Sequence, residues 1–136
     1  MNVTARIHPG MTGSEATRVT REVTVAHFHP EMPEVYGTPF MIYLMEVAAS
    51  NAIQPFLPAG WVSVGADVNV RHLAATPVGQ TVTAKAAVTA VNGRVIAFTV
   101  EAFDEVERIG EGTHLRAVIE RSRFERKLED KRTAGG

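Results

Sequence analysis

One long apolar segment constrains the fold of this chain most strongly. Phe40 to Gln54 is dominated by apolar residues and has a proline on each side, Pro39 and Pro55. Pro39 suits the first helical position, where its missing N–H costs nothing, and Thr38 before it is a favoured N-cap. The segment therefore predicts a helix of about four turns. Because most of its faces are apolar, we expect this helix to be largely buried.

Length and composition limit the class of protein. The chain has 136 residues, of which 45% are apolar and 21% charged, which fits one folded domain with one core and excludes a disordered chain. A net charge of -1 gives no electrostatic support for a nucleic-acid or membrane partner. The absence of cysteine excludes disulfides, thiolate metal sites and a cysteine nucleophile. With no bilayer-spanning segment and no secretory signal at the N-terminus, we expect a cytoplasmic protein.

After Gly60 the apolar residues alternate with polar ones, which predicts strands. Within residues 61–72, Val68 and Val70 are in phase with His72, and Val62 and Val64 are expected on the same face. A glycine inside this strand, Gly65, predicts a bulge or the close approach of a ligand to the backbone. An Asn-Gly pair predicts a tight hairpin. The other predicted strands are 17–28, 81–90, 95–103 and 112–124.

This order of elements predicts an α+β fold. One strand, one buried helix and then four antiparallel strands fit a five-stranded sheet wrapped around one long central helix, the hotdog fold. So small a sheet leaves edges exposed, and we expect a homodimer to cover them. We place a flexible N-terminal arm at 1–15, the hotdog domain at 16–128 and a flexible tail at 129–136.

Glu46 is the only charged residue of the predicted helix. Burying an unpaired carboxylate costs several kcal/mol, so Glu46 must be solvated, paired or protonated. The spacing of three or four residues puts it on one helix face with Tyr43, Ser50 and Gln54. This polar stripe either faces water or lines a crevice in which Glu46 acts as general base or nucleophile.

Two further residues are candidates for chemistry beside Glu46. His72 is expected to point at the helix, where a histidine and a carboxylate would stabilise each other; the alternative is a satisfied core histidine. Thr38 is explained as an N-cap, but the free N–H groups of a helix N-terminus also suit a developing oxyanion.

The other polar clusters carry weaker signals. His27 and His29 lie near two glutamates, but the prolines between them and the lack of a distant ligand argue against a metal, so we expect none. His114 shares a strand face with Arg116, as a solvated cationic edge or as an anchor for an anionic substrate such as a coenzyme A phosphate. The chain has no Walker loop, dinucleotide glycine motif or G-x-S-x-G, and we expect no cofactor.

Three stretches resemble a known family. TPFMIYLMEVA, VGADVNVRHLAATPVGQTV and GEGTHLRAVIERSRF are similar to the fluoroacetyl-CoA thioesterase group of hotdog-fold enzymes, over roughly residues 17–128. The resemblance implies a homodimeric hydrolase acting on acyl-CoA thioesters. It places the family's catalytic residues on Thr38, Glu46 and His72, and its substrate-contacting residues on Gly65 and Arg116.

The segment before the helix departs from that family. It reads HPEMPEVYG, with His29 and Met32 where aromatic residues would be expected, and Pro39 stands where a glycine would follow the threonine. The resemblance thus implies the scaffold and the catalytic residues but not selectivity for fluoroacetyl-CoA. We predict hydrolysis of a short or small acyl-CoA.

Three alternatives remain open at this point. A non-catalytic hotdog protein that binds acyl-CoA or another small molecule would bind a ligand without turnover. A hotdog hydratase usually places an aspartate and a histidine on the helix and its leading loop, whereas His72 is predicted on a strand. A purely structural dimer would leave Glu46 on an open solvent face.

Overall fold

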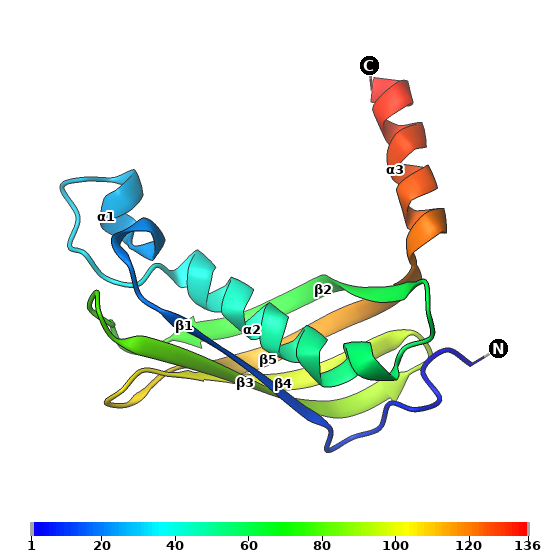
Figure 1. The fold of residues 1–136 in the computed structure, drawn as a ribbon, viewed down its shortest axis with the longest axis horizontal. Coiled ribbons are helices and arrows are strands. Elements are labelled where there is room, and N and C mark those ends of the chain that lie inside the picture. The colour runs from blue at the N-terminus through cyan, green and yellow to red at the C-terminus, as the bar shows by residue number, and fades with distance from the viewer. Residues whose placement is uncertain (1, 136) are drawn as a thin grey trace.

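The computed structural model describes residues 2–135 and shows one sheet curled around one helix (Figure 1). The long helix α2 (Thr38–Ile53) lies across five antiparallel strands in the order β1-β3-β4-β5-β2. The predicted α+β arrangement is confirmed. The strands are β1 (Thr12–Arg18), β2 (Trp61–His72), β3 (Thr81–Asn92), β4 (Val95–Phe103) and β5 (Arg108–Glu120).

Shorter helices complete the described chain. The 3₁₀ turn η1 (Arg21–Val23) and the helix α1 (Val25–Phe28) lie between β1 and α2, and the 3₁₀ turn η2 (Gln54–Phe56) extends α2. A C-terminal helix, α3 (Arg121–Gly135), follows β5. Within the described residues, no helix is both long and apolar enough to cross a membrane.

The strand predicted at 17–28 is wrong. The first strand is β1, which ends at Arg18, and helical turns follow it. The position of the first strand depends on its packing against α2 and not on where β-branched residues are most frequent. A Cβ on Gly13 would lie 2.3 Å from the carbonyl oxygen of Ala48, so only glycine lets this strand approach α2 so closely. Val3 and Ile7, in the expected arm, are buried, and the boundary that we placed after residue 15 falls inside β1.

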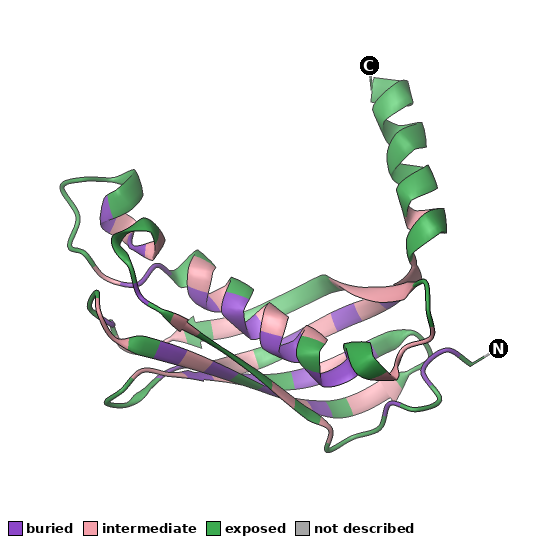
Figure 2. Cartoon of the chain, viewed as in Figure 1, coloured by how far each residue is buried: buried purple, intermediate pink, exposed green. Residues whose placement is uncertain are grey.

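The C-terminal part also differs from expectation. β5 ends at Glu120, whereas a strand was predicted to 124, and the boundary placed after residue 128 falls inside α3. Charged residues with high helix propensity fill α3, and Arg121 pairs with Glu125 one turn later. Figure 2 shows α3 almost entirely exposed and projecting away from the sheet.

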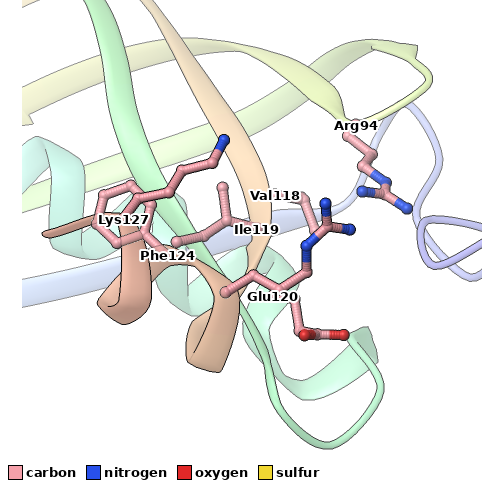
Figure 3. Close-up of a pocket in the computed structure, with 7 residues that line it drawn as sticks. Arg94, Val118, Ile119, Glu120, Phe124 and Lys127 are labelled. Carbon is pink, nitrogen blue, oxygen red and sulfur yellow. The ribbon is translucent and has the colours of Figure 1, made fainter. Parts of the chain in front are cut away.

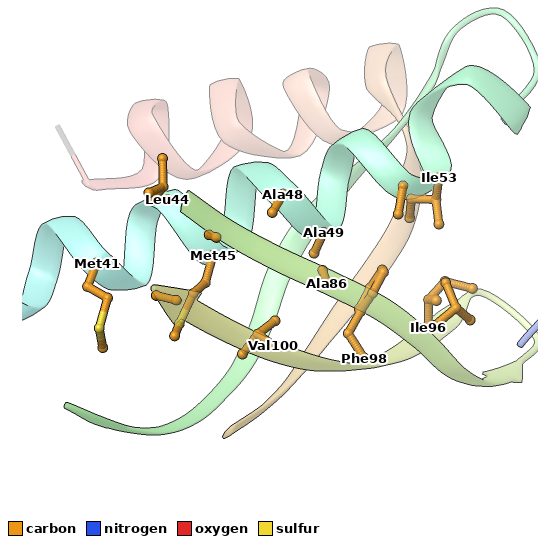
Figure 4. Packing of buried hydrophobic residues seen from close by; sticks show 14 of the residues in the cluster. Met41, Leu44, Met45, Ala48, Ala49, Ile53, Ala86, Ile96, Phe98 and Val100 are labelled. Atoms are coloured by element: carbon orange, nitrogen blue, oxygen red, sulfur yellow. The ribbon is translucent and has the colours of Figure 1, made fainter. Parts of the chain in front are cut away.

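The core lies between α2 and the concave face of the sheet. Small alanines on α2 let it approach the strands closely, and large side chains fill the ends of the layer (Figure 4). Burying each large apolar side chain contributes roughly 1.5–3 kcal/mol to folding. The large side chains of this core are Met41, Met45 and Ile53 of α2 with Val82, Ile96, Phe98 and Val100 of the sheet, and Ala48 and Ala52 lie between them.

A bulge in β2 sets which side chains face α2. The register with β5 shifts between Gly65 and Asp67, as the glycine predicted. Gly65 pairs with Arg116 before the bulge and Val68 pairs with His114 after it, so the inward phase changes by one residue. The expectation that Val62 and Val64 share the face of His72 is therefore wrong, and Ser63 takes the inward position instead.

Candidate active site

Thr38 is the first residue of α2, and its side chain does not cap the helix. The N-cap is Gly37, whose carbonyl accepts the backbone N–H of Met41 at 3.2 Å. The prediction of Thr38 as N-cap is wrong. The Thr38 hydroxyl does not bond to the helix end and is available to another partner. Its oxygen lies 2.7 Å from Nδ1 of His72, the last residue of β2. Two of the three predicted catalytic residues thus form a hydrogen-bonded pair.

The His72 ring is half-buried and neutral. Burial lowers the pKa of His72 below its usual 6.5, since removal from water disfavours the charged ring. Its Nε2 is enclosed and has no hydrogen-bond partner among the described residues. The nitrogen suited to exchange a proton with a reacting group is therefore Nδ1, which lies on the Thr38 hydroxyl.

Glu46 lies in the middle of α2 and is paired with a buried arginine. Its side chain is 32% exposed, and Oε2 lies 3.4 Å from Nη1 of Arg116 on β5. Arg116 is held by Ser63, to whose hydroxyl Nε donates at 2.7 Å and to whose carbonyl Nη2 donates at 2.9 Å. Because Ser63 fixes the guanidinium independently of Glu46, the ion pair orients the Glu46 carboxylate.

His114 completes this cluster from the same strand. It is 2% exposed, and burial lowers its pKa below the usual 6.5. Nδ1 lies 2.8 Å from the carbonyl of Asp67, and Nε2 lies 3.1 Å from Nη1 of Arg116. A neutral ring that donates from Nδ1 and accepts at Nε2 satisfies both contacts. The interpretation of His114 as a solvated cationic edge is wrong, because it is a buried support for Arg116.

Gly65 brings the backbone of β2 against the Glu46 carboxylate. A Cβ at this position would lie 2.3 Å from Oε2 of Glu46 and 3.5 Å from Cε1 of His114. The group that lies against this backbone is the chain's own Glu46 side chain. The cluster of Glu46, Gly65, His114 and Arg116 is called the carboxylate cluster below.

The Thr38–His72 pair and the carboxylate cluster lie apart within one chain. Eight residues of helix separate Thr38 from Glu46, about 12 Å along the axis. Seven residues of strand, one of them the extra residue of the bulge, separate Gly65 from His72, about 20 Å. The expected contact between Glu46 and His72 is thus not formed within the chain, and Arg116 supplies the charge that Glu46 needs.

An apolar pocket opens beside the start of α2. It has a volume of about 310 Å³ and is lined by Val25, Phe28, Pro39 and Phe40, among others. The Phe28 and Phe40 rings stack with centroids 6.1 Å apart, although Phe28 is 62% exposed. Sequence analysis did not single out this pocket, since its two aromatic rings come from different helices. No group of three or more residues able to hold a metal occurs in the part of the chain that the structure describes.

Comparisons with known proteins agree with this geometry. Residues 19–122 match the family model of the fluoroacetyl-CoA-specific thioesterase. The fluoroacetyl-CoA thioesterase of Streptantibioticus cattleyicolor is 45% identical over 118 residues, which span 82% of this chain and 85% of that protein.

Solved structures extend the likeness to the fold. A mutant of the fluoroacetyl-CoA-specific thioesterase FlK in complex with fluoroacetate and CoA is 41% identical, with a TM-score of 0.80 over 87% of this chain and 99% of that one. A hot-dog-like protein from Thermanaerovibrio acidaminovorans, 23% identical, has a TM-score of 0.85 over 96% of this chain and 97% of its own, which shows the fold alone. The predicted hotdog fold and family resemblance are confirmed: this chain belongs to the fluoroacetyl-CoA-specific thioesterase family.

Proposed function

We propose that this chain is a thioesterase that hydrolyses a short or small acyl-CoA to the free acid and coenzyme A. The observation that carries the proposal is the Glu46 carboxylate, which a buried arginine holds in place in the middle of an apolar helix. A structural protein gains nothing from such a group, whereas a hydrolase needs it as nucleophile or base. Membership of the thioesterase family supports the same reading.

Each candidate residue has a role in this reaction. The Thr38 hydroxyl and the Thr38 backbone N–H polarise the thioester carbonyl oxygen, since Pro39 has no N–H and the N–H groups of Phe40 and Met41 bond to the Gly37 carbonyl. Glu46 either attacks the carbonyl carbon to form an anhydride, which water then hydrolyses, or removes a proton from the attacking water. His72 exchanges a proton with water and the departing thiolate. Gly65 and Arg116 position the carboxylate and contact the substrate. Water is the only co-reactant, so the reaction requires no cofactor.

We infer that the enzyme acts as a homodimer joined through β2. This strand is at the edge of the sheet, and its residues from Gly65 to Asn69 are all exposed. A long open edge is normally covered, and a second copy pairing antiparallel would cover it. A two-fold axis near Val68 and Asn69 would bring the partner subunit's Gly65 opposite His72. Each site would then combine Thr38 and His72 of one protomer with the carboxylate cluster of the other.

Mixing two inactive variants tests this shared site. Glu46→Gln and His72→Ala each disable one component, and subunit exchange between them gives hybrid dimers. Half of a random mixture is hybrid, and one of the two sites in each hybrid keeps both groups, so we expect about a quarter of wild-type activity to return. The measurement is thioester hydrolysis after mixing under exchange conditions. A mixture as inactive as its components would place Glu46 and His72 of one chain in the same site.

The acyl group should be small, and fluoroacetyl-CoA should not be strongly preferred. His29 and Met32 precede α2 where the family is expected to carry aromatic residues, and Met32 is 47% exposed. Pocket side chains discriminate by only about 1–3 kcal/mol per methylene. We place the enzyme in the cytoplasm, where acyl-CoA thioesters are made and used, with no nucleic-acid or membrane partner.

A thiol-release assay over a panel of acyl-CoAs tests the function. The panel runs from fluoroacetyl-CoA and acetyl-CoA to phenylacetyl-CoA, and we expect turnover on one class of acyl group. Calorimetric binding of the same compounds runs in parallel, with non-hydrolysable thioether analogues where turnover interferes. Saturable binding without thiol release would favour the alternative, a non-catalytic acyl-CoA or small-molecule binding protein.

A further inference from the structure

A cationic notch lies at the base of α3, away from the candidate catalytic residues. Its cavity of about 160 Å³ is bounded by the end of β5, by Arg94 just before β4, and by Arg123, Phe124 and Lys127 of α3. Figure 3 shows Phe124 and Lys127 on one side of the β5 end and Arg94 on the other. The notch thus joins two segments that lie about thirty residues apart in the chain.

The charge of the notch is positive and unneutralised. Arg94, Arg123 and Lys127 take part in none of the ion pairs found in residues 2–135, whereas Arg121, next to the notch, is paired with Glu125. The only carboxylate in the lining is Glu120, which accepts the Ser122 hydroxyl at 3.0 Å. Three cations facing one carboxylate, in a chain of net charge -1, make a local site for an anion.

Arg94 is held in position by an aromatic ring. Its Cζ lies 4.5 Å from the centroid of Trp61, a cation–π contact that fixes the plane of the guanidinium and leaves its N–H edge available. On α3, Arg123 and Lys127 are one turn apart, so they project from the same face. Phe124 beside them offers an apolar ring on which a planar base can stack.

The notch lies in line with the carboxylate cluster. Glu120 follows Arg116 by four residues on β5, about 13 Å along the strand. Trp61 pairs with Glu120 across the ladder, and Ser63, two residues later, holds Arg116. From the helix side, the Gln54 amide donates to the Trp61 carbonyl at 3.0 Å. The polar groups of Ser63, Trp61 and Gln54 thus lie between Arg116 and the notch, and are called the polar path below.

We propose that the cationic notch binds the phosphate-bearing nucleotide end of coenzyme A, with its phosphates on Arg94, Arg123 and Lys127 and its adenine against Phe124. This assignment rests on the proposed function, because it places the thioester at the carboxylate cluster and the pantetheine arm along the polar path. Arg123 and Lys127 lie beyond residue 122, where the family match ends.

The test compares a charge reversal in the notch with a matched reversal outside it. Arg123→Glu/Lys127→Glu alters the notch, and Arg126→Glu/Lys131→Glu makes the same change in charge on α3 at positions that do not line it. Both pairs are exposed, so neither should affect folding. We expect the notch variant to raise KM for an acyl-CoA about tenfold with kcat unchanged, and the control to stay near wild type.

Two probes separate this proposal from the proposed function. The same acyl group on N-acetylcysteamine lacks the nucleotide, so the notch variant should hydrolyse it like wild type. Calorimetric titration with coenzyme A itself needs no hydrolysis, and we expect the notch variant to bind it about tenfold more weakly. If the wild type hydrolyses no thioester but the notch variant loses coenzyme A binding, the proposed function is wrong and the proposal that the notch binds coenzyme A is supported. Hydrolysis with the same KM in wild type and the notch variant would contradict coenzyme A binding at the notch and leave the proposed function intact.

Discussion

Glu46→Gln should abolish most thioester hydrolysis, with kcat falling by about 10²–10⁴-fold or more. Glutamine has the shape of glutamate but is neither a nucleophile nor a base at neutral pH. Arg116 keeps its two bonds to Ser63 in this variant, so the buried guanidinium stays satisfied and the fold should persist. Thiol release at saturating substrate measures the loss, and thermal unfolding confirms that the protein is folded.

A matched control exists on the outer face of the sheet. Glu101 also pairs with an arginine, Arg108, at 3.2 Å, and is 44% exposed. Glu101→Gln removes the same kind of ion pair and should leave kcat unchanged, because exposed pairs contribute little. Near wild-type turnover in Glu46→Gln would exclude Glu46 from the chemistry.

Turnover by the wild-type protein in labelled water can distinguish the two roles open to Glu46, nucleophile and general base. If Glu46 attacks the thioester and water opens the resulting anhydride at the Glu46 carbonyl, turnover in heavy-oxygen water places the label in the Glu46 carboxylate. If Glu46 acts as a base, or if water opens the anhydride at the acyl carbonyl, the label enters only the released acid. Mass analysis of the peptide that contains Glu46 distinguishes these outcomes.

The helix and the central strands could be predicted because their signals are local. Prolines on both sides of an apolar run fix α2, and strict alternation around Asn92 and Gly93 fixes β3 and β4. β1 gave no such signal, since its sequence TGSEATR contains one small apolar residue and depends on contact with α2. α3 was missed because its helix propensity comes from charged residues without an apolar face to reveal it.

The candidate site was only half predictable for a related reason. Glu46 and His72 were found because a lone carboxylate in an apolar helix and an in-phase histidine are unusual within their own elements. Their contacts depend on segments far apart in the chain: Glu46 and Arg116 are 70 residues apart, and Thr38 and His72 are 34 apart. The alignment of β2 with β5 decides which of these side chains come into contact. That alignment includes the bulge in β2, and the sequence pattern does not show how the bulge changes the faces of the side chains before it.

Gly65→Ala should separate catalysis from stability. The added methyl group would lie 2.3 Å from Oε2 of Glu46, so the carboxylate must move away. The atom displaced is the far end of a flexible, partly exposed side chain, and the unfolding free energy should change by only about 1 kcal/mol. A displacement of about 1 Å in a reacting group lowers the rate by about 10²-fold, and we expect kcat/KM to fall by this amount.

Gly13→Ala is the opposite case and serves as the comparison. Its methyl group would meet backbone atoms of α2, 2.3 Å from the Ala48 carbonyl oxygen and 2.5 Å from the Ala52 nitrogen, and neither can move without shifting the helix. We expect a loss of about 1–3 kcal/mol in unfolding free energy, as overpacked cores show. Urea unfolding and kcat/KM, measured on both variants, give the two quantities. If Gly65→Ala lost stability and activity in the same proportion as Gly13→Ala, the glycine would serve the sheet and not the carboxylate, and the close contact between β2 and Glu46 would have no catalytic purpose.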